Sequence, residues 1–217
     1  FYFAQFLPAI YSQYPLLLPR SFNGRENFLE PLRLVLAGRE VEFIEETRFE
    51  KFRELVWMQS PTLPGPFPAK RSGEPLLAVH GGGLRLYRDE MLRQLGLSQG
   101  SIRTRGSRIF ISRGETNIRP YNEKALIEIA EQFGFVAVRL QELSLAQSIE
   151  VVLGAEFIVG PHGAGWANAL FARAGTKGLL WTWRAASEYN WFKNLAQVAG
   201  MNLRVTFTDK SGLLGPH

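Results

Sequence analysis

Cysteine is absent from the 217-residue sequence, and histidine occurs only three times. The lack of cysteine excludes disulfide bonds and thiolate-bound zinc, and it favours a reducing compartment such as a bacterial-type cytoplasm. No His-x-x-x-His or Asp-x-Asp pair occurs, and one histidine, His217, is the last residue. We therefore expect no metal held by protein side chains; a bound ion would be carried by the phosphates of a substrate.

Long apolar runs are absent as well. None approaches the roughly 20 residues that a membrane-spanning helix needs. The first residues, Phe1-Tyr2-Phe3, lack an initiator methionine and the charged start of a signal peptide, so we expect that residues upstream are missing. The hydrophobic fraction of 46% and the charged fraction of 21% are those of an ordinary globular protein, long enough for one large or two small domains.

The charge balance predicts anionic partners. The formal net charge is +5 and the isoelectric point is about 9.7. A phosphate-bearing ligand, an acidic polymer and an anionic membrane face all fit this charge. Nucleic acid is not expected, because the sequence has no RNA- or DNA-binding motif and no helix dense in arginine and lysine.

The second half of the chain alternates buried-strand patterns with helical periods. This alternation requires crossover connections, and it predicts a mostly parallel sheet with helices on both faces. Strands are expected at residues 108–112, 136–140, 157–160, 178–182 and 203–207, and helices at 122–133 (N-cap Asn122, stop Gly134), 144–153 (N-cap Ser144), 166–171 and 187–199 (stop Gly200).

The first half has a similar outline, which predicts a smaller α/β unit. Proline and glycine interrupt residues 60–75, so this stretch is expected to be a loop or linker. We place a domain boundary near residue 100, giving domains 1–100 and 101–217 with a cleft between them. The helices expected in the first domain are 2–12, 26–37 and 84–95, and the strands are 15–18, 41–44 and 55–58.

A glycine-rich loop, Pro161-His162-Gly163-Ala164-Gly165, stands where a strand turns into a helix. In open α/β sheets such a turn offers unpaired N–H groups to an anion at the carboxyl edge of the sheet. The glycines would let phosphate oxygens approach the backbone, and the amide of Asn168 could face the ligand from the first helical turn. The alternative is that the glycines only make a tight connection.

Two side chains accompany this loop. Arg113 ends the strand 108–112, so it projects from the same sheet edge, where a guanidinium could pair with a diphosphate. His162 could donate to a phosphate oxygen or leaving group. A surface ion pair is the alternative for Arg113, and a bond to a nearby carbonyl is the alternative for His162. Arg119 and Glu123 are weaker candidates, because an acid in a first helical turn is favoured anyway.

These segments resemble the family 61 glycosyltransferases, which include bacterial capsular-polysaccharide enzymes. The resemblance rests on Ile111-Ser112-Arg113, Arg119, Asn122-Glu123, Glu142-Leu143-Ser144 and the run from Ala155 to Gly165 with Asn168 and Phe171. It implies a GT-B arrangement of two Rossmann-like units with the donor site between them, inverting transfer from a nucleotide sugar, and no obligatory metal. We expect no cofactor, and we expect the donor substrate to carry uridine diphosphate or another nucleoside diphosphate. It also implies a donor site lined by Arg113, His162, Gly163, Ala164 and Gly165, to which we add Pro161, Asn168, Arg119 and Glu123.

Two positions depart from the family pattern. The family usually has a carboxylate after the strand that follows the glycine loop, and Leu180-Trp181-Thr182-Trp183 offers none. Near the start the family often has a histidine, where this chain has Phe1. A second motif, Val79-His80-Gly81-Gly82-Gly83, is similar to the oxyanion loop of esterases. The sequence has a Gly-x-Ser-x-Gly match at Gly96-Leu97-Ser98-Gln99-Gly100, but this match follows the helix expected at 84–95 and does not follow a strand as a nucleophile elbow does, so a flexible junction is the preferred interpretation of the glycine run.

The sequence therefore predicts an inverting glycosyltransferase acting on a glycan or polysaccharide hydroxyl in the cytoplasm, with peripheral contact to an anionic membrane left open. Arg113 and His162 are expected to stabilise the departing diphosphate. The general base is expected from the first domain, where Glu45, Glu46 and His80 are unranked candidates. A catalytically inactive nucleotide-sugar-binding module is the main alternative, and a hydrolase is the remote one.

Overall fold

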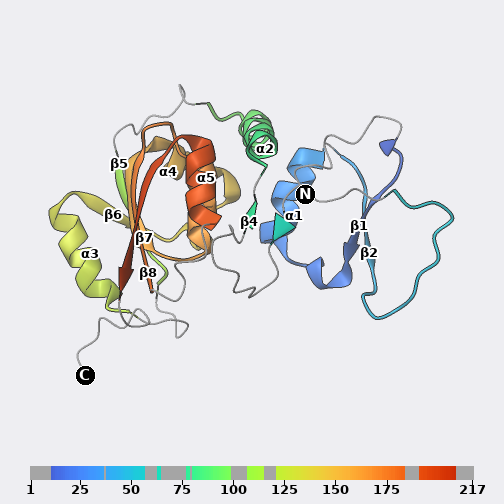
Figure 1. Cartoon of the computed structure of the whole chain (residues 1–217), viewed down its shortest axis with the longest axis horizontal. Helices are drawn as coiled ribbons and strands as arrows, with labels where there is room; N and C mark the ends of the chain where they lie inside the picture. The colour runs from blue at the N-terminus through green and yellow to red at the C-terminus, as the bar shows by residue number, and fades with distance from the viewer. Residues whose placement is uncertain are drawn as a thin grey trace.

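A five-stranded parallel sheet dominates the second half of the chain in the computed structural model (Figure 1). The structure describes residues 11–36, 38–56, 63–64, 77–78, 80–98, 107–114, 121–183 and 191–208. All neighbouring strands of this sheet pair in parallel, as the sequence predicts. The strand order is β6-β5-β7-β8-β9, and the strands are β5 (Ser107–Ile111), β6 (Phe135–Val138), β7 (Ala155–Pro161), β8 (Lys177–Trp183) and β9 (Asn202–Thr208).

Helices cover both faces of this sheet, as expected. Helix α3 (Glu123–Gln132) lies on one face, and α4 (Leu145–Gly154), the 3₁₀ helix η5 (Ala164–Phe171) and α5 (Trp191–Ala199) lie on the other (Figure 1). The strand order explains this division. The chain steps from β5 to β6 in one direction and then progresses through β7, β8 and β9 in the opposite direction, so right-handed crossovers place the first helix on one face and the later ones on the other.

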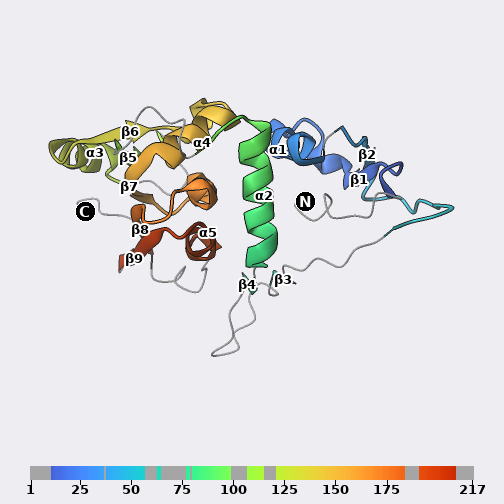
Figure 2. The ribbon, with the colours of Figure 1, turned by 90° about the horizontal axis from the view of Figure 1, so that it is seen from above.

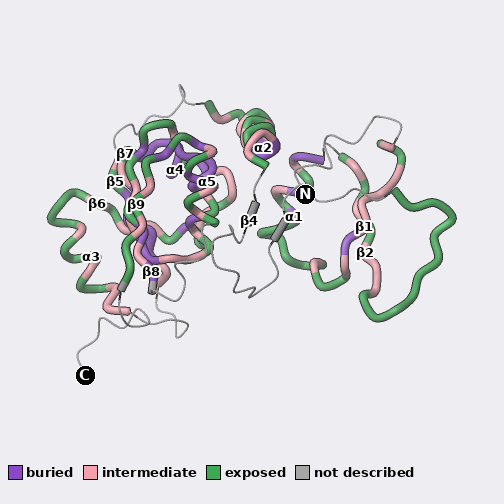
Figure 3. Tube along the Cα trace, in the orientation of Figure 1, coloured by how far each residue is buried: buried purple, intermediate pink, exposed green. Residues whose placement is uncertain are grey.

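The main core lies between the sheet and the α4, η5 and α5 layer, where the trace is mostly buried (Figure 3). Helix α3 contributes no buried residue: Ile129 and Phe133, which belong to its apolar period, are 51% and 63% exposed. The period therefore identifies the helix correctly without identifying a buried face. The residues at the centre of the main core include Ile109, Ile111, Val152, Ile158, Trp166 and Leu180.

The predicted helix ends are largely confirmed. Ser144 forms a full capping box with Gln147, and Gly134 and Gly200 end their helices with φ of 75° and 73°. Asn122 stands at the N-cap of α3 as expected, but its side chain makes no capping hydrogen bond. The predicted N-cap position is therefore confirmed, and the predicted capping hydrogen bond of the side chain is wrong.

The described part of the first half contains a small βαβ unit. Strand β1 (Leu16–Pro19) leads through the short 3₁₀ helix η3 (Arg20–Phe22) and helix α1 (Glu26–Leu36) to β2 (Val41–Ile44), which pairs with β1 in parallel. Leu18, Leu29, Leu32 and Leu36 form its core. The helix and the two strands predicted here are confirmed.

Other predictions for the first half fare differently. No strand forms at residues 55–56, where the side chain of Leu55 is 61% exposed, so this apolar pair has no sheet to join; residues 57–58 lie outside the described residues. The helix predicted at 2–12 lies almost wholly outside them. Within the predicted linker, β3 (Leu63–Pro64) pairs antiparallel with β4 (Leu77–Ala78), just beyond it.

Helix α2 (Gly81–Gln94) lies between α1 and the layer of α4 and α5 (Figures 1 and 2). It begins three residues earlier than predicted because His80 is its N-cap: the Nδ1 atom of His80 accepts a hydrogen bond of 2.9 Å from the main-chain N–H of Gly83. The glycine run is thus the first turn of a helix, and the interpretation as a flexible junction is wrong. One buried cluster joins α1, α2, α4 and η5 through Val35, Leu84, Met91, Ile149, Leu170 and Phe171.

Candidate functional site

The order of the strands singles out the carboxyl ends of β5 and β7. These strands are neighbours, yet the chain leaves β5 toward β6 on one side and leaves β7 toward β8 on the other. Ligands of open α/β sheets bind outside the carboxyl ends of the strands at such a switch point. Arg113 follows β5 and His162 follows β7, so both predicted residues flank this point.

Arg113 and the glycine loop lie in contact range. A Cβ atom placed on Gly163 would be 3.8 Å from Nε of Arg113 and 3.9 Å from its Cδ. The guanidinium-bearing side chain therefore runs beside the middle of the loop. The sequence could place these residues only at one edge of the sheet, and the structure places them side by side.

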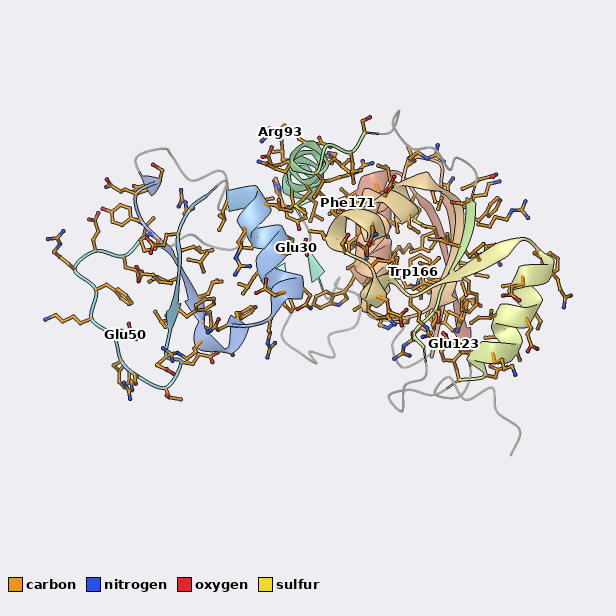
Figure 4. All side chains as sticks on the ribbon, turned by 180° about the vertical axis from the view of Figure 1, so that it is seen from behind. Glu30, Glu50, Arg93, Glu123, Trp166 and Phe171 are labelled. Atoms are coloured by element: carbon orange, nitrogen blue, oxygen red, sulfur yellow. The ribbon has the colours of Figure 1, made fainter. Side chains whose placement is uncertain are left out.

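Three carbonyl groups of the loop accept hydrogen bonds from residues of η5. The oxygen of Pro161 accepts from Nε1 of Trp166 at 3.0 Å, and the oxygen of Gly163 accepts from the main-chain N–H of the same residue at 3.1 Å. The oxygen of Gly165 accepts from Nδ2 of Asn168 at 3.2 Å. Trp166 is 1% exposed and lies in the interior (Figure 4). Trp166 therefore holds the start and the middle of the loop, and Asn168 holds its end.

Three of the N–H groups of the same loop donate no hydrogen bond within the described residues. Within the described part of the chain, the amides of Gly163, Ala164 and Gly165 donate no hydrogen bond, whereas that of His162 donates to the oxygen of Trp181 at 2.8 Å. Ala164 and Gly165 are the first two residues of the eight-residue η5, and Gly163 is its N-cap, so these amides belong to a helix N-terminus, which favours an anion. The loop thus has carbonyls held by the protein and three successive amides that donate no hydrogen bond within the described residues.

The glycines serve different physical needs. A Cβ on Gly165 would be 2.9 Å from Cγ2 of Ile111, and a Cβ on Gly160 would be 3.0 Å from the Cβ and the oxygen of the same isoleucine. These two glycines allow η5 and β7 to pack closely on β5. Gly163 has an extended backbone (φ 179°, ψ 172°) and no such crowding. The expectation that both loop glycines serve ligand approach therefore fits Gly163, while close packing explains Gly165.

Asn168 and His162 have defined surroundings. The amide of Asn168 is directed at the carbonyl of Gly165, so it supports the loop in this structure. The imidazole of His162 is half-buried against the ring of Phe192 on α5, with the ring centroids 5.0 Å apart and the planes at 59°. Phe192 fixes one side of the imidazole at the carboxyl end of β7. Arg119, the remaining basic candidate, lies outside the described residues.

Glu123 holds the main chain of Arg113. Its Oε1 atom accepts a hydrogen bond of 2.7 Å from the N–H of Arg113 and a second one from the hydroxyl of Tyr121. The carbonyl of Arg113 accepts from Nε2 of Gln141 at 3.2 Å. Figure 4 shows Glu123 at the start of α3, beside the sheet. The carboxylate, predicted as a donor ligand, is used here to fix the end of β5.

Tyr121 is a residue of this site that the sequence did not reveal. Its ring packs edge-on against the ring of Trp181, with the ring centroids 6.4 Å apart. The ring of Trp181 packs in turn against that of Phe110, with the centroids 5.7 Å apart. Burial, followed by the hydrogen bond to Glu123, raises the pKa of the Tyr121 phenol above its ordinary value. These contacts join three separate segments, so no local period could have indicated them.

The three candidate bases are engaged in local contacts. Glu45 pairs with Nε of Arg20 at 2.7 Å, and Glu46 accepts from the hydroxyl of Ser21 at 3.1 Å. Both follow β2, which lies beyond α1 from the large sheet (Figures 1 and 2). His80 accepts a hydrogen bond at Nδ1, which places the proton of a neutral imidazole on Nε2. That tautomer opposes a general-base role through Nε2.

The described residues contain neither a cluster suited to a metal ion nor a membrane-spanning helix. There, no group of three or more histidine, cysteine, aspartate or glutamate residues is arranged to hold a metal ion. No described helix combines the length and the apolar character needed to cross a membrane. The metal independence expected from the sequence stays a prediction.

Comparison with known proteins adds one match. A family model described as Glycosyltransferase 61 matches residues 3–179, a span that contains Arg113, Glu123 and the whole glycine loop. Among curated proteins no significant match is found.

Proposed function

The chain belongs to the glycosyltransferase 61 family, and on this premise we propose that it transfers a sugar, with inversion, from a uridine diphosphate donor to a hydroxyl of a glycan or polysaccharide. Family membership makes the protein a glycosyltransferase, which uses a nucleotide-sugar donor and a glycan acceptor. It lends no support to the inactive module considered as an alternative. The inversion, the donor nucleotide and the acceptor are the proposed parts.

The observation that supports this proposal is the set of three amides without a hydrogen-bond acceptor in the described residues, which lies beside Arg113. The amides of Gly163, Ala164 and Gly165 donate no hydrogen bond within the described residues, and the Arg113 side chain runs along Gly163. A diphosphate carries oxygens that can accept from several N–H groups and from both arms of a guanidinium. We assign the loop and Arg113 to the donor diphosphate.

Such a site favours the reaction as well as binding. When the glycosidic bond to the donor breaks, negative charge grows on the departing diphosphate, and preorganised donors stabilise that charge more than they stabilise the ground state. Because the loop carbonyls are held by Trp166 and Asn168, its amides need little reorganisation as the charge develops. In this proposal His162 contributes one more donor, with its ring held against Phe192.

We also propose that the two halves act as the two units of a GT-B arrangement, with domains at 1–100 and 101–217. The small parallel βαβ unit of the first half and the large sheet of the second support this interpretation. The contact between Gly81 and α5, where a Cβ would meet Cγ2 of Val198 at 3.5 Å, places the start of α2 against the donor unit. We propose further that the protein acts in capsular-polysaccharide synthesis, in the cytoplasm and in peripheral contact with an anionic membrane.

The proposed function is tested by donor hydrolysis and transfer. We would incubate the protein with a panel of nucleotide sugars that includes several uridine diphosphate sugars, with and without simple glycoside acceptors, and measure the released nucleoside diphosphate in parallel with a chelator and with added divalent metal. We expect at least one donor to be cleaved, and we expect this cleavage to be lost when Arg113 is replaced by alanine. Release only from donors carrying another nucleotide would contradict the uridine assignment, and dependence on added divalent metal would contradict metal independence.

A further inference from the structure

A carboxylate beside a phosphate-binding arginine can compete with the phosphate for the guanidinium. Arginine and carboxylate groups pair readily, often through two parallel hydrogen bonds. A Glu123 side chain paired with the guanidinium of Arg113 would neutralise the charge that the proposed function assigns to the donor diphosphate. Within the described residues, no ion pair of 4.0 Å or less joins these two side chains.

The structure shows what occupies the carboxylate instead. One oxygen, Oε1 of Glu123, accepts from the main-chain N–H of Arg113 at 2.7 Å and from the hydroxyl of Tyr121. This N–H belongs to Arg113, two residues after the end of β5, and the N–H of the intervening Ser112 is bonded to the carbonyl of Val138 in β6. The phenol of Tyr121 supplies the second bond. The carboxylate is therefore held between the main-chain N–H of Arg113 and a side-chain donor that lies two residues before the start of α3.

Tyr121 is well placed to keep this bond. Its ring packs edge-on against Trp181, which in turn packs against Phe110 of β5, so the hydroxyl is directed from a fixed aromatic cluster. The pKa of the phenol is raised by burial and by the adjacent carboxylate, so Tyr121 stays protonated and remains a donor throughout the physiological pH range.

We propose that Tyr121 is a positioning residue, whose hydroxyl holds the Glu123 carboxylate on the main chain of Arg113 and thereby keeps it away from the guanidinium that binds the donor diphosphate. This role rests on the proposed function. It also changes the role of Glu123, which acts on the donor through Arg113 and does not contact the donor itself.

The first experiment removes only the hydroxyl. Tyr121→Phe keeps the ring on Trp181 but frees the carboxylate, and we expect the affinity for uridine diphosphate to fall about tenfold while the affinity for uridine changes little, the scale of one hydrogen bond to a charged group. Both ligands are titrated by calorimetry. The matched control is Tyr14→Phe, which removes a 2.6 Å hydrogen bond from a tyrosine to Glu54 in the first half of the chain and should leave both affinities unchanged.

The second experiment removes the charge. The amide of Glu123→Gln can still accept from the N–H of Arg113 but cannot pair ionically with its guanidinium. We therefore expect the double variant Tyr121→Phe with Glu123→Gln to bind uridine diphosphate more tightly than Tyr121→Phe alone. A purely structural role for Tyr121 predicts the reverse, with the two losses adding.

The outcomes separate this inference from the function beneath it. A parent protein that binds no uridine diphosphate would overturn the diphosphate assignment and this role together. A parent that binds, with Tyr121→Phe binding equally well, would overturn only the role of Tyr121. If Tyr121→Phe fails to fold, Glu123→Gln alone decides: retained or tighter diphosphate binding supports the positioning role, and a tenfold loss would assign Glu123 to the donor itself.

Discussion

Three glycines near the site show how one residue type meets separate demands. Gly160 and Gly165 lie against Ile111, where a Cβ would come within 3.0 and 2.9 Å, whereas Gly163 has room for one. Ile111 is β-branched and buried, so it cannot easily move aside. Space for the fold and space for the ligand are thus provided by different glycines of one loop.

This difference predicts unequal costs for the same substitution. Gly165→Ala should lower the free energy of unfolding by about 1–3 kcal/mol, the usual cost of overpacking a core. Gly163→Ala should cost little, because its backbone is extended and its new methyl group would meet Arg113 at ordinary contact distance. Urea unfolding of both variants gives the comparison. Equal losses would show that the packing against Ile111 does not explain Gly165.

His162 is expected to act on the leaving group. In the structure its ring is held by Phe192 and its main-chain N–H is bonded to Trp181. If it stabilises the departing diphosphate, His162→Ala should lower donor turnover by roughly 10²-fold or more, the scale found when one preorganised donor is removed. His162→Asn should keep part of the rate, since an amide still donates a hydrogen bond.

The control for this prediction is stability. His162 is half-buried in a loop, so both variants should unfold at nearly the parent urea concentration. A folded His162→Ala protein that transfers sugar at the parent rate would rule out the catalytic role. Activity that falls only in proportion to the loss of folded protein would instead show that the imidazole shapes the turn.

At the scale of single elements, α2 is the piece that joins the two halves. Met91 is fully buried in the cluster shared with α1, α4 and η5, whereas Leu86 on the same helix is 52% exposed. Met91→Ala should therefore destabilise the protein by about 2–5 kcal/mol, and Leu86→Ala by much less. Thermal unfolding of both variants measures this. A Met91→Ala variant as stable as Leu86→Ala would mean that α2 does not carry this packing.

Element positions were largely predictable from the sequence because local signals determine them. Strand and helix periods, the Ser144 cap and the Gly134 stop are enough to identify the βα series of the second half. The run at residues 55–56 shows the limit of such signals, since an apolar pair becomes a strand only if a neighbouring strand accepts it.

The site was predictable in part for a related reason. Arg113 and His162 follow strands, so their common sheet edge could be inferred from the sequence alone. The bond from Trp166 to Pro161, the bond from Tyr121 to Glu123 and the cap made by His80 depend on side-chain directions set by packing. Patterns of residue type contain no information on those directions, and for this reason the predictions for Asn122 and for the glycine run at the start of α2 were wrong.

Across the whole molecule, the net charge of +5 is consistent with an anionic ligand, but local geometry decides where that ligand binds. Arg108 and Arg113 illustrate this point on one strand. Arg108 lies at the amino end of β5, where its guanidinium donates to the carbonyl of Phe133 at 2.8 Å and covers the ring of Phe157. Arg113 follows the carboxyl end and lies beside Gly163 of the glycine loop.

The central claim is that the glycine loop and Arg113 bind the donor diphosphate, and titration of uridine diphosphate and uridine by calorimetry tests it most directly. For Arg113→Ala the account predicts a loss of about tenfold or more in diphosphate affinity, the scale of a charged hydrogen bond, and little change for uridine. The matched variant Arg108→Ala should leave both affinities near those of the parent. Equal losses of both ligands on Arg113→Ala, or a diphosphate loss as large on Arg108→Ala, would contradict the claim.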